Sequence, residues 1–274
     1  MTDLPLDIAV VTDEISRTLP EALDYARSWG LTRFELREGS ERRFPDFTAE
    51  EIAAVESVLR DGCQVTAVSP GILKGAADDE AAITEALEVT LPRTITLAAR
   101  FDCPLVIVFG FERYAGEPEE NRTRAMRAFE RAADQAAEAG MRIVIENEPN
   151  FWIDDPASAS AMLDEIGHPA LALNWDPANQ HWGGHLPTRA DFDAVLPYLA
   201  NLHVKDFAPN SSPDAPWVPV GEGETPWAQI FPWVVAESNL SHVTLETHCV
   251  PLVESSRRSL DGMRRLLNEA AHAV

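Results

Sequence analysis

The sequence has little of several features that would point to particular classes of protein. Only three of its 274 residues are cysteine, Cys63, Cys103 and Cys249, too few and too scattered for a disulfide framework or a paired-cysteine metal site. We therefore expect reduced thiols and a cytoplasmic location. Positive charge is also scarce, because 22 Lys and Arg face 45 Asp and Glu, for a net charge of −23. A surface this acidic repels phosphate backbones and anionic lipid, which disfavours binding to nucleic acid or to a membrane.

Long apolar runs are also missing. The longest, such as Pro104–Gly110, fall far short of the ~20 residues that span a bilayer. The N-terminal residues show neither the basic nor the apolar region of an export signal. In contrast, 45% hydrophobic and 24% charged residues are ordinary values for a folded protein. The chain is therefore long enough, and apolar enough, to build one large domain.

Two kinds of segment alternate along the chain. Short β-branched runs have the length of buried strands and recur about every 30 residues. They are Ile8–Thr12, Arg33–Arg37, Gln64–Ser69, Leu105–Phe109, Arg142–Asn147, Leu171–Trp175, Asn201–Lys205 and His242–Glu246. Longer stretches with helical spacing lie between them, at Leu19–Trp29, Phe47–Arg60, Glu80–Ala99, Pro118–Ala139, Pro156–Ile166, Arg189–Leu199, Pro226–Ser238 and Val253–His272. Thr48, with Glu51 three residues later, forms a capping-box pattern at the start of the second helix.

This alternation predicts the fold. Eight βα units in ~250 residues are typical of a (β/α)8 TIM barrel, here a single α/β domain spanning residues 1–274. A doubly wound open sheet is the alternative, but it usually carries a glycine-rich phosphate turn after its first strand. Residues 10–16 contain no glycine. The proline-rich stretch at residues 208–225 is predicted to be an active-site loop after the seventh strand.

Polar residues stand at the ends of the last four predicted strands, where burial would favour apolar ones. The strands end in or near Glu146, Asp176, His203 and Glu246, one on each. Because barrel enzymes keep their chemistry at the C-terminal ends of the strands, these four groups should meet at one rim. Three carboxylates and one imidazole would repel one another there without a cation.

A bound divalent metal ion resolves that repulsion. Oxygen-rich ligands with one nitrogen suit Mn²⁺, Mg²⁺ or Co²⁺, and Zn²⁺ fits as well. Any one of these residues alone would more often be an ion-pair partner or a buried histidine than a ligand. Four of them on successive strands favour one metal site, because the alternative needs four separate buried partners.

At this level of detail the sequence resembles the xylose isomerase-like TIM barrels, a family of sugar isomerases, epimerases and dehydratases. The resemblance covers nearly the whole chain. It rests on Ile-Glu146-Asn, Asp176-Pro-Ala-Asn179, His203-Val-Lys-Asp206, Gly221-Glu-Gly223 and Leu-Glu246. It implies that Glu146, Asp176, His203 and Glu246 bind one divalent ion, most often Mn²⁺. It also implies that Glu146 and Glu246 are the catalytic acid/base pair.

The sequence argues against membership of one branch of that family, the endonuclease IV repair enzymes. That branch holds a metal cluster and needs further histidines, but the second to fourth predicted strands here end in Leu36-Arg37, Ser69-Pro70 and Phe109-Gly110. Asn179 stands where that branch and many epimerases have histidine. The net charge of −23 also opposes DNA binding.

The site predicts proton transfer next to a carbonyl. A metal chelated by a carbonyl and its neighbouring hydroxyl acidifies the C–H between them and stabilises the enediolate. One glutamate would remove the proton and the other return it. We therefore expect an isomerase or epimerase acting on a sugar, keto-sugar or polyol-derived substrate. A metal-dependent lyase or dehydratase, of the inosose dehydratase type, is the alternative, and a non-catalytic partner subunit is a third.

Further polar and aromatic residues are candidates for substrate binding. Arg37 could grip a carboxylate or phosphate, or form an ion pair with Glu35 or Glu38. Lys205 could bind a substrate oxygen or pair with a metal-binding carboxylate. The remaining candidates around the rim are Glu148, Trp152, Asn179 and His181. The family resemblance further implies a homodimer or homotetramer.

Overall fold

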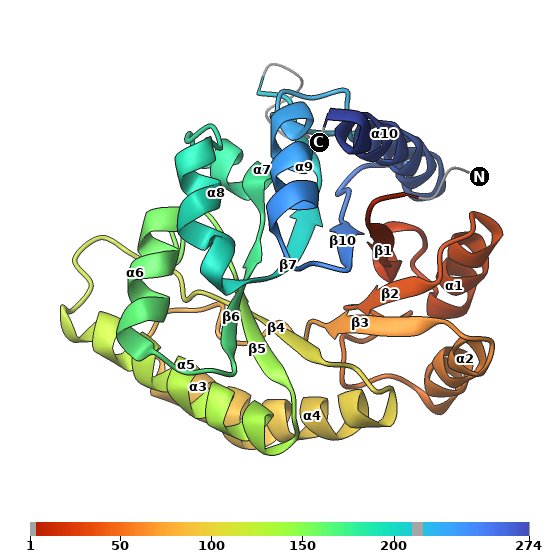
Figure 1. Cartoon of the computed structure of the whole chain (residues 1–274). Coiled ribbons are helices and arrows are strands. Elements are labelled where there is room, and N and C mark those ends of the chain that lie inside the picture. The colour runs from red at the N-terminus through yellow and green to blue at the C-terminus, as the bar shows by residue number, and fades with distance from the viewer. Residues whose placement is uncertain (1–3, 210–215, 274) are drawn as a thin grey trace.

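The computed structural model describes residues 4–209 and 216–273, and these form the predicted closed barrel of eight parallel strands (Figure 1). Hydrogen bonds join the strands in the order β1-β10-β7-β6-β5-β4-β3-β2, so the barrel follows the order of the chain. The barrel strands are β1 (Asp7–Val11), β2 (Arg33–Leu36), β3 (Gln64–Val68), β4 (Leu105–Phe109), β5 (Arg142–Glu146), β6 (Leu171–Trp175), β7 (Leu199–Val204) and β10 (His242–Leu245). Each lies within two residues of its predicted bounds.

Helices surround the barrel (Figure 1). They are α1 (Leu19–Ser28), α2 (Ala49–Arg60), α3 (Glu80–Glu85), α4 (Leu91–Arg100), α5 (Glu120–Glu138), α6 (Pro156–Ile166), α7 (Pro177–Trp182), α8 (Arg189–Val195), α9 (Trp227–Glu237) and α10 (Leu252–Ala273). The capping box predicted for α2 is present, because Thr48 Oγ1 accepts from Glu51 N and Glu51 Oε2 accepts from Thr48 N. None of the helices in the described ranges is long and apolar enough to cross a membrane.

The predicted helix Glu80–Ala99 is interrupted. A π-helical turn at Ala86–Thr90 separates α3 from α4. Pro92 stands at the start of α4 and explains the interruption, because it has no N–H to donate and its ring crowds the carbonyl four residues earlier. Pro197 has a similar effect in the predicted helix Arg189–Leu199, which becomes α8 followed by a 3₁₀ turn at Leu196–Tyr198.

Inside the barrel, apolar and polar residues form separate layers. Five small or aliphatic residues fill the half nearer the strand starts, namely Ala67, Leu105, Ile107, Val144 and Ala172. Above them the interior is polar, with Glu35, Asn201 and Thr244 completely buried. Glu35 in β2 faces His203 inside the barrel, and Arg37, two residues later, reaches the groups at the rim. This layering places the buried charged groups of the barrel interior towards the C-terminal ends of the strands.

The loop after β7 is folded back onto the barrel. A short ribbon closes it, in which β8 (Asp206–Phe207) pairs with β9 (Trp217–Val218). The sequence predicted the loop at residues 208–225 but not the ribbon. The carboxylate of Asp206 accepts hydrogen bonds from the backbone N–H groups of Gly221, Gly223 and Thr225. On its other side, the loop touches α10 at Gly262, where a Cβ atom would lie 1.9 Å from the carbonyl oxygen of Val220. The loop is therefore held between the end of β7 and α10.

The close contact at Gly262 gives a prediction for stability. Gly262→Ala adds a methyl group that must push the loop away, which should cost ~1–3 kcal/mol of unfolding free energy, typical of overpacking. This outweighs the gain of up to ~1 kcal/mol that Ala brings to a helix interior. Gly75→Ala is the matched control, because its Cβ would meet nothing within 4 Å. Urea denaturation of both variants tests this, and equal midpoints would show that the loop is not packed on α10.

Candidate metal centre

Four side chains predicted to be metal ligands converge at the C-terminal rim. Glu146 is the last residue of β5, Asp176 precedes α7, His203 lies in β7 and Glu246 follows β10. All four are buried, and each offers one ligand atom within 4.8 Å of the other three. Nδ1 of His203 lies 3.2 Å from Oε1 of Glu146 and 3.4 Å from Oε2 of Glu246. The structure therefore brings together the complete set that the sequence indicated.

Glu35 fixes the orientation of His203. Nε2 of His203 lies 3.0 Å from Oε2 and 3.2 Å from Oε1 of Glu35, so Nδ1 is turned towards the other carboxylates. Asn201 donates to Glu35 over 3.4 Å and in turn accepts from Thr244. Burial raises the pKa of Glu35, against the lowering effect of His203. A carboxylate behind a ligating histidine is a common feature of metal sites, since it fixes the tautomer and strengthens the ligand.

From the sequence, Glu35 is expected only as a partner for Arg37. A carboxylate at the centre of a short apolar strand was the available signal, but the sequence alone did not indicate that it would face a histidine from β7.

Asp176 is held by its neighbours in the loops that follow β5 and β6. Oδ1 of Asp176 accepts from the backbone N–H of Asn179 at 2.8 Å and so caps α7. The side-chain oxygen of Asn147 accepts from Asp176 N at 2.7 Å, and its amide donates to Asp176 O at 2.9 Å. With Oδ1 used in the cap, Oδ2 is the oxygen that faces the cluster.

Lys205 lies among the metal-binding carboxylates. Its Nζ is 2.7 Å from Oδ2 of Asp176 and 2.8 Å from Oε2 of Glu246. Burial opposes the charge of Lys205, but these carboxylates outweigh that effect and raise its pKa. Of the two roles that the sequence left open for Lys205, the structure shows pairing with the carboxylates.

Arg37 has different partners from those that the sequence suggested. Its guanidinium pairs with Asp13 and Glu14 in the turn after β1, and with Glu246. It does not pair with Glu35 or Glu38 among the described residues. Glu35 lies deeper in the barrel than Arg37 and pairs with His203 there. Asp13 and Glu14 lie at the level of Arg37. Arg37 therefore holds Glu246 from outside while Lys205 holds it from inside.

Besides Arg37 and Lys205, the two imidazoles of His203 and His248 lie close to Glu246. His248 lies 3.5 Å from Oε1 of Glu246 through Nε2 and 3.2 Å from Glu14 through Nδ1. Burial alone would raise the pKa of Glu246, but the charges of Lys205, His248 and His203 hold the pKa well below its usual range. The pKa of His248 is raised to about 9, because Glu246 and Glu14 outweigh its burial. In this arrangement Glu246 is a carboxylate.

The remaining predicted substrate-binding residues divide into two groups. Glu148 and Asn179 line the cavity above the cluster, with the amide of Asn179 3.5 Å from Oε1 of Glu146. Trp152 and His181 are not part of that lining. Arg113 covers the ring of Trp152 at 4.2 Å, and His181 packs on Phe207 with ring centroids 4.9 Å apart. Both contacts are those of packing residues.

The cavity above the cluster has a volume of about 520 Å³. Trp182 and Trp217 form part of its wall, with ring centroids 5.6 Å apart. Lys74 lies on the lining too, 3.3 Å from Glu148. Lys74 and Lys205 are the only two lysines of the whole sequence, and both line this cavity. A volume of this size suits a small molecule rather than a polymer.

The balance of charge in this region fits a divalent cation. Arg37 and Lys205 are the two permanently charged cations in direct contact with the carboxylates around His203. Buried carboxylates outnumber them, namely Asp13, Glu14, Glu35, Glu146, Asp176 and Glu246. Buried charges need partners, and oxygen atoms with one imidazole nitrogen are a common ligand set for divalent ions. Glu146, Asp176, His203 and Glu246 would hold the ion.

The fold and this site together define a (β/α)8 barrel with a buried carboxylate–imidazole cluster that could hold one metal ion. The sequence matches the family described as xylose isomerase-like TIM barrel over residues 23–268, so the chain belongs to this family. No curated protein sequence matches it significantly.

Solved structures show the same fold at low sequence identity. An L-ribulose 3-epimerase has a TM-score of 0.80 at 15% identity, over 98% of this chain and 96% of that one. AsbF of Bacillus anthracis, a probable 3-DHS dehydratase, has a TM-score of 0.78 at 17% identity, over 94% and 98%. A xylose isomerase-like TIM barrel protein from Mycobacterium smegmatis, in complex with magnesium, has a TM-score of 0.73 at 17% identity, over 97% of each chain.

The contact between Glu35 and His203 gives a prediction for metal binding. Glu35→Gln keeps the shape but removes the charge behind the imidazole, and the affinity for Mn²⁺ should fall ~10–100-fold. Glu38→Gln is the control, because it removes the same charge from the lining of the same cavity. The side chain of Glu38 is 45% exposed, and its ion pairs within the described residues are with Arg17 and Arg43. Calorimetric titration with Mn²⁺ compares the two, and equal affinities would show that Glu35 does not support the metal ligand.

Proposed function

We propose that this protein is a divalent-metal-dependent isomerase or epimerase of a sugar, keto-sugar or polyol-derived substrate. The observation that carries the proposal is the placement of two glutamates around one metal site. Glu146 and Glu246 come from β5 and β10, with β6 and β7 between them in the barrel, and both reach Nδ1 of His203. Both also line the cavity, where they can flank a substrate carbon from two sides.

The proposed reaction is proton transfer at a carbon next to a carbonyl. A bound divalent ion would polarise the carbonyl and the adjacent hydroxyl and so acidify the C–H between them. One glutamate would remove this proton on one side and the other would return a proton on the opposite side. Glu246, which its cationic neighbours keep ionised, is suited to the removal. Arg37 and Lys205 hold Glu246 in position, and the amide of Asn179 lies beside Glu146. The oxygen-rich ligand set favours Mn²⁺, with Mg²⁺, Co²⁺ and Zn²⁺ as alternatives.

The cavity supports a small, hydroxyl-bearing substrate. Its deep end carries charged and polar groups for hydroxyl and carbonyl oxygens, among them Lys205 and Glu148. Its outer wall carries the rings of Trp182 and Trp217, which suit the apolar face of a sugar or cyclic polyol. A sugar-like substrate needs polar groups for its oxygen atoms and an apolar surface for its carbon face, and the cavity offers both.

Dehydration is the second candidate, and His248 favours it. This imidazole lines the cavity, is about one third exposed and lies beside Glu246. It could donate a proton to a hydroxyl that leaves from the carbon next to the deprotonated one. Both reactions begin with the same proton removal, so the products distinguish them. An unsaturated product that has lost water would indicate a dehydratase, and a rearranged product of unchanged mass an isomerase or epimerase.

Two matched variants test whether Glu246 transfers a proton. Glu246→Gln should lower turnover by at least ~10²-fold, the low end of what a positioned acid or base contributes, while metal affinity falls only modestly. Asp176→Asn should weaken metal binding, and excess Mn²⁺ should restore part of its activity. Turnover is measured by NMR as incorporation of solvent deuterium into keto-sugars and inososes, and metal content by elemental analysis, with close to one ion expected per wild-type chain.

Two results would contradict the proposal. If excess Mn²⁺ restores both variants equally, Glu246 is only a ligand and the mechanism with two glutamates is wrong. If wild-type protein contains no metal and added Mn²⁺ does not stabilise it against heat, the metal centre itself is wrong.

We further propose a homodimer or homotetramer that binds neither nucleic acid nor membrane and works in the cytoplasm. The three cysteines are free and buried, which suits a reducing compartment. Among the described residues, Trp182, Leu186 and Val250 are large apolar side chains that are more than half exposed. Exposed apolar groups of this kind often mark contacts between subunits. Light scattering should give two or four times 30.2 kDa at micromolar concentration, and a monomer mass would refute the assembly.

A further inference from the structure

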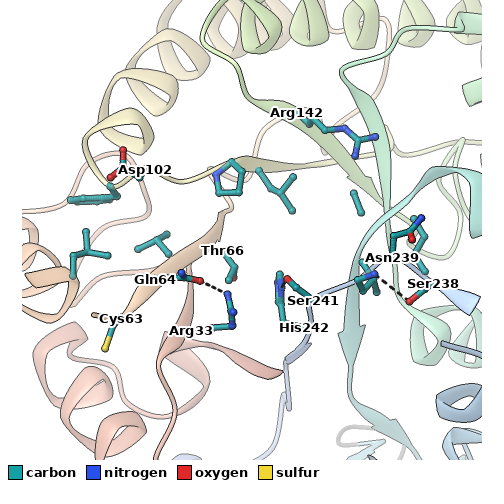
Figure 2. A pocket seen from close by; sticks show the side chains of 18 of the residues that line it. Arg33, Cys63, Gln64, Thr66, Asp102, Arg142, Ser238, Asn239, Ser241 and His242 are labelled. Atoms are coloured by element: carbon teal, nitrogen blue, oxygen red, sulfur yellow. Dashed lines mark hydrogen bonds between the residues drawn. The ribbon is translucent and has the colours of Figure 1, made fainter. Parts of the chain in front are cut away.

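A second cavity lies at the opposite end of the barrel, where the strands begin. Its volume is about 780 Å³, larger than that of the cavity above the metal centre. Figure 2 shows side chains from several strands meeting there, and the first residues of four strands, Arg33, Gln64, Arg142 and His242, are among them. Cavities that bind small organic molecules have volumes in this range.

The apolar layer inside the barrel separates the two cavities. Leu105 belongs to this layer and also lines the second cavity, while Glu35 and Asn201 lie on the far side of it. The two linings share no residue among the described parts of the chain. A ligand in the second cavity would therefore not contact the metal ligands, and the cavity is a separate site.

His242 presents an unused hydrogen-bonding atom at this cavity. The residue is 93% buried, since only 7% of its surface is exposed. Its Nδ1 lies 3.2 Å from Oγ of Ser241, but its Nε2 has no hydrogen-bond partner within the described residues. Burial, together with the charge of Arg33, lowers the pKa of His242 to about 4, so the ring is neutral at pH 7. In the tautomer in which Nδ1 accepts from Ser241, Nε2 carries the hydrogen and is a donor without an acceptor. Nearly all buried polar groups have a partner, so a buried donor of this kind suggests a bound acceptor.

Two arginines line the second cavity, and they differ in their partners. Arg33 is held in place by Asp7 at 2.7 Å and by the side chain of Gln64. The guanidinium of Arg142 forms no ion pair or hydrogen bond with any described residue, although the protein has 45 acidic residues. Asp102 is the one carboxylate of the lining in the described ranges. Arg142 is thus the cation of the lining that no described carboxylate pairs with.

We propose that the second cavity binds a small organic anion that carries a carboxylate or a phosphate group. Arg142 offers a free guanidinium with a fork of donors that matches either group. In the tautomer with its hydrogen on Nε2, His242 adds a neutral donor. Gln64, Thr66 and Asn239 also line the cavity and could meet the hydroxyl groups of such a ligand (Figure 2). The cavity is much larger than a bare inorganic ion, which is why an organic anion suits it better.

Calorimetric titration of the purified protein tests the proposal. Glycerol 3-phosphate and succinate are the probes, because they present a phosphate and a carboxylate on similarly small frames. At least one should bind, and the tighter of the two identifies the preferred group. Arg142→Met and His242→Gln should each weaken that binding at least ~10-fold, as expected for the loss of a charged or buried donor. Arg127→Met is the matched control, since this arginine is exposed on α5, away from the cavity, and it should bind as wild type does.

A variant at the other end of the barrel separates this site from the proposed active site. Glu246→Gln alters the metal centre, and it should leave binding of the preferred probe unchanged. Binding that is lost in Glu246→Gln but kept in Arg142→Met would place the anion at the metal centre and overturn the proposal. The absence of binding of both probes at millimolar concentration would also overturn it. His242→Gln keeps a polar side chain of similar size, and Arg142 is exposed, so folding of both variants can be confirmed by circular dichroism.

Discussion

The buried negative charge around His203 is the constraint on which the C-terminal end of this barrel depends. Six carboxylates lie at or below the rim, almost without access to water. Such a group is stable only if cations and hydrogen-bond donors meet every oxygen, because an unpaired buried charge is far too costly for a fold to tolerate. Lys205, Arg37 and the imidazoles supply part of this compensation. The remaining negative charge is the physical basis for affinity towards a divalent ion.

The same requirement explains why the surrounding chain is so firmly held. Asn147 joins the ends of β5 and β6, and Glu35 holds His203 from below. Asp206, one residue after Lys205, ties the long loop to the end of β7 through backbone N–H groups. Each of these contacts limits the movement of a neighbouring charged side chain. A site whose geometry is fixed before the substrate binds avoids reorganisation during the reaction.

The sequence was sufficient to predict the barrel and the four converging residues, because both follow from patterns along the chain. Glu146, Asp176, His203 and Glu246 stand at the ends of four successive predicted strands. This spacing places them at one rim without any knowledge of packing. The partners of Arg37 and the role of Glu35 could not be predicted in this way. They depend on the stagger between strands, which decides which residue of β2 lies level with which residue of β7 and with the turn after β1. Asp13 and Glu14 precede Arg37 by more than 20 positions, so no local pattern connects them.

The interruption of the helix at Pro92 had a visible signal in the sequence, because proline is unfavourable inside a helix. The predicted range nevertheless ran through it, since the helical spacing of apolar residues continues on both sides. The second cavity had no such signal. Arg142 and His242 stand at the starts of strands, where exposed polar residues are ordinary, and only the closed barrel shows that they line one cavity.

The scarcity of lysine has a practical consequence for chemical labelling. The side chain of Lys74 is 56% exposed, whereas that of Lys205 is 2% exposed and fixed between two carboxylates. Lysine-directed reagents should therefore modify one lysine in the native protein, at the entrance of the metal-site cavity. Lys205 should become reactive only when the barrel opens. A fluorophore attached through this chemistry would report on the cavity entrance without any engineered residue, and the ratio of the two modified lysines would measure local unfolding.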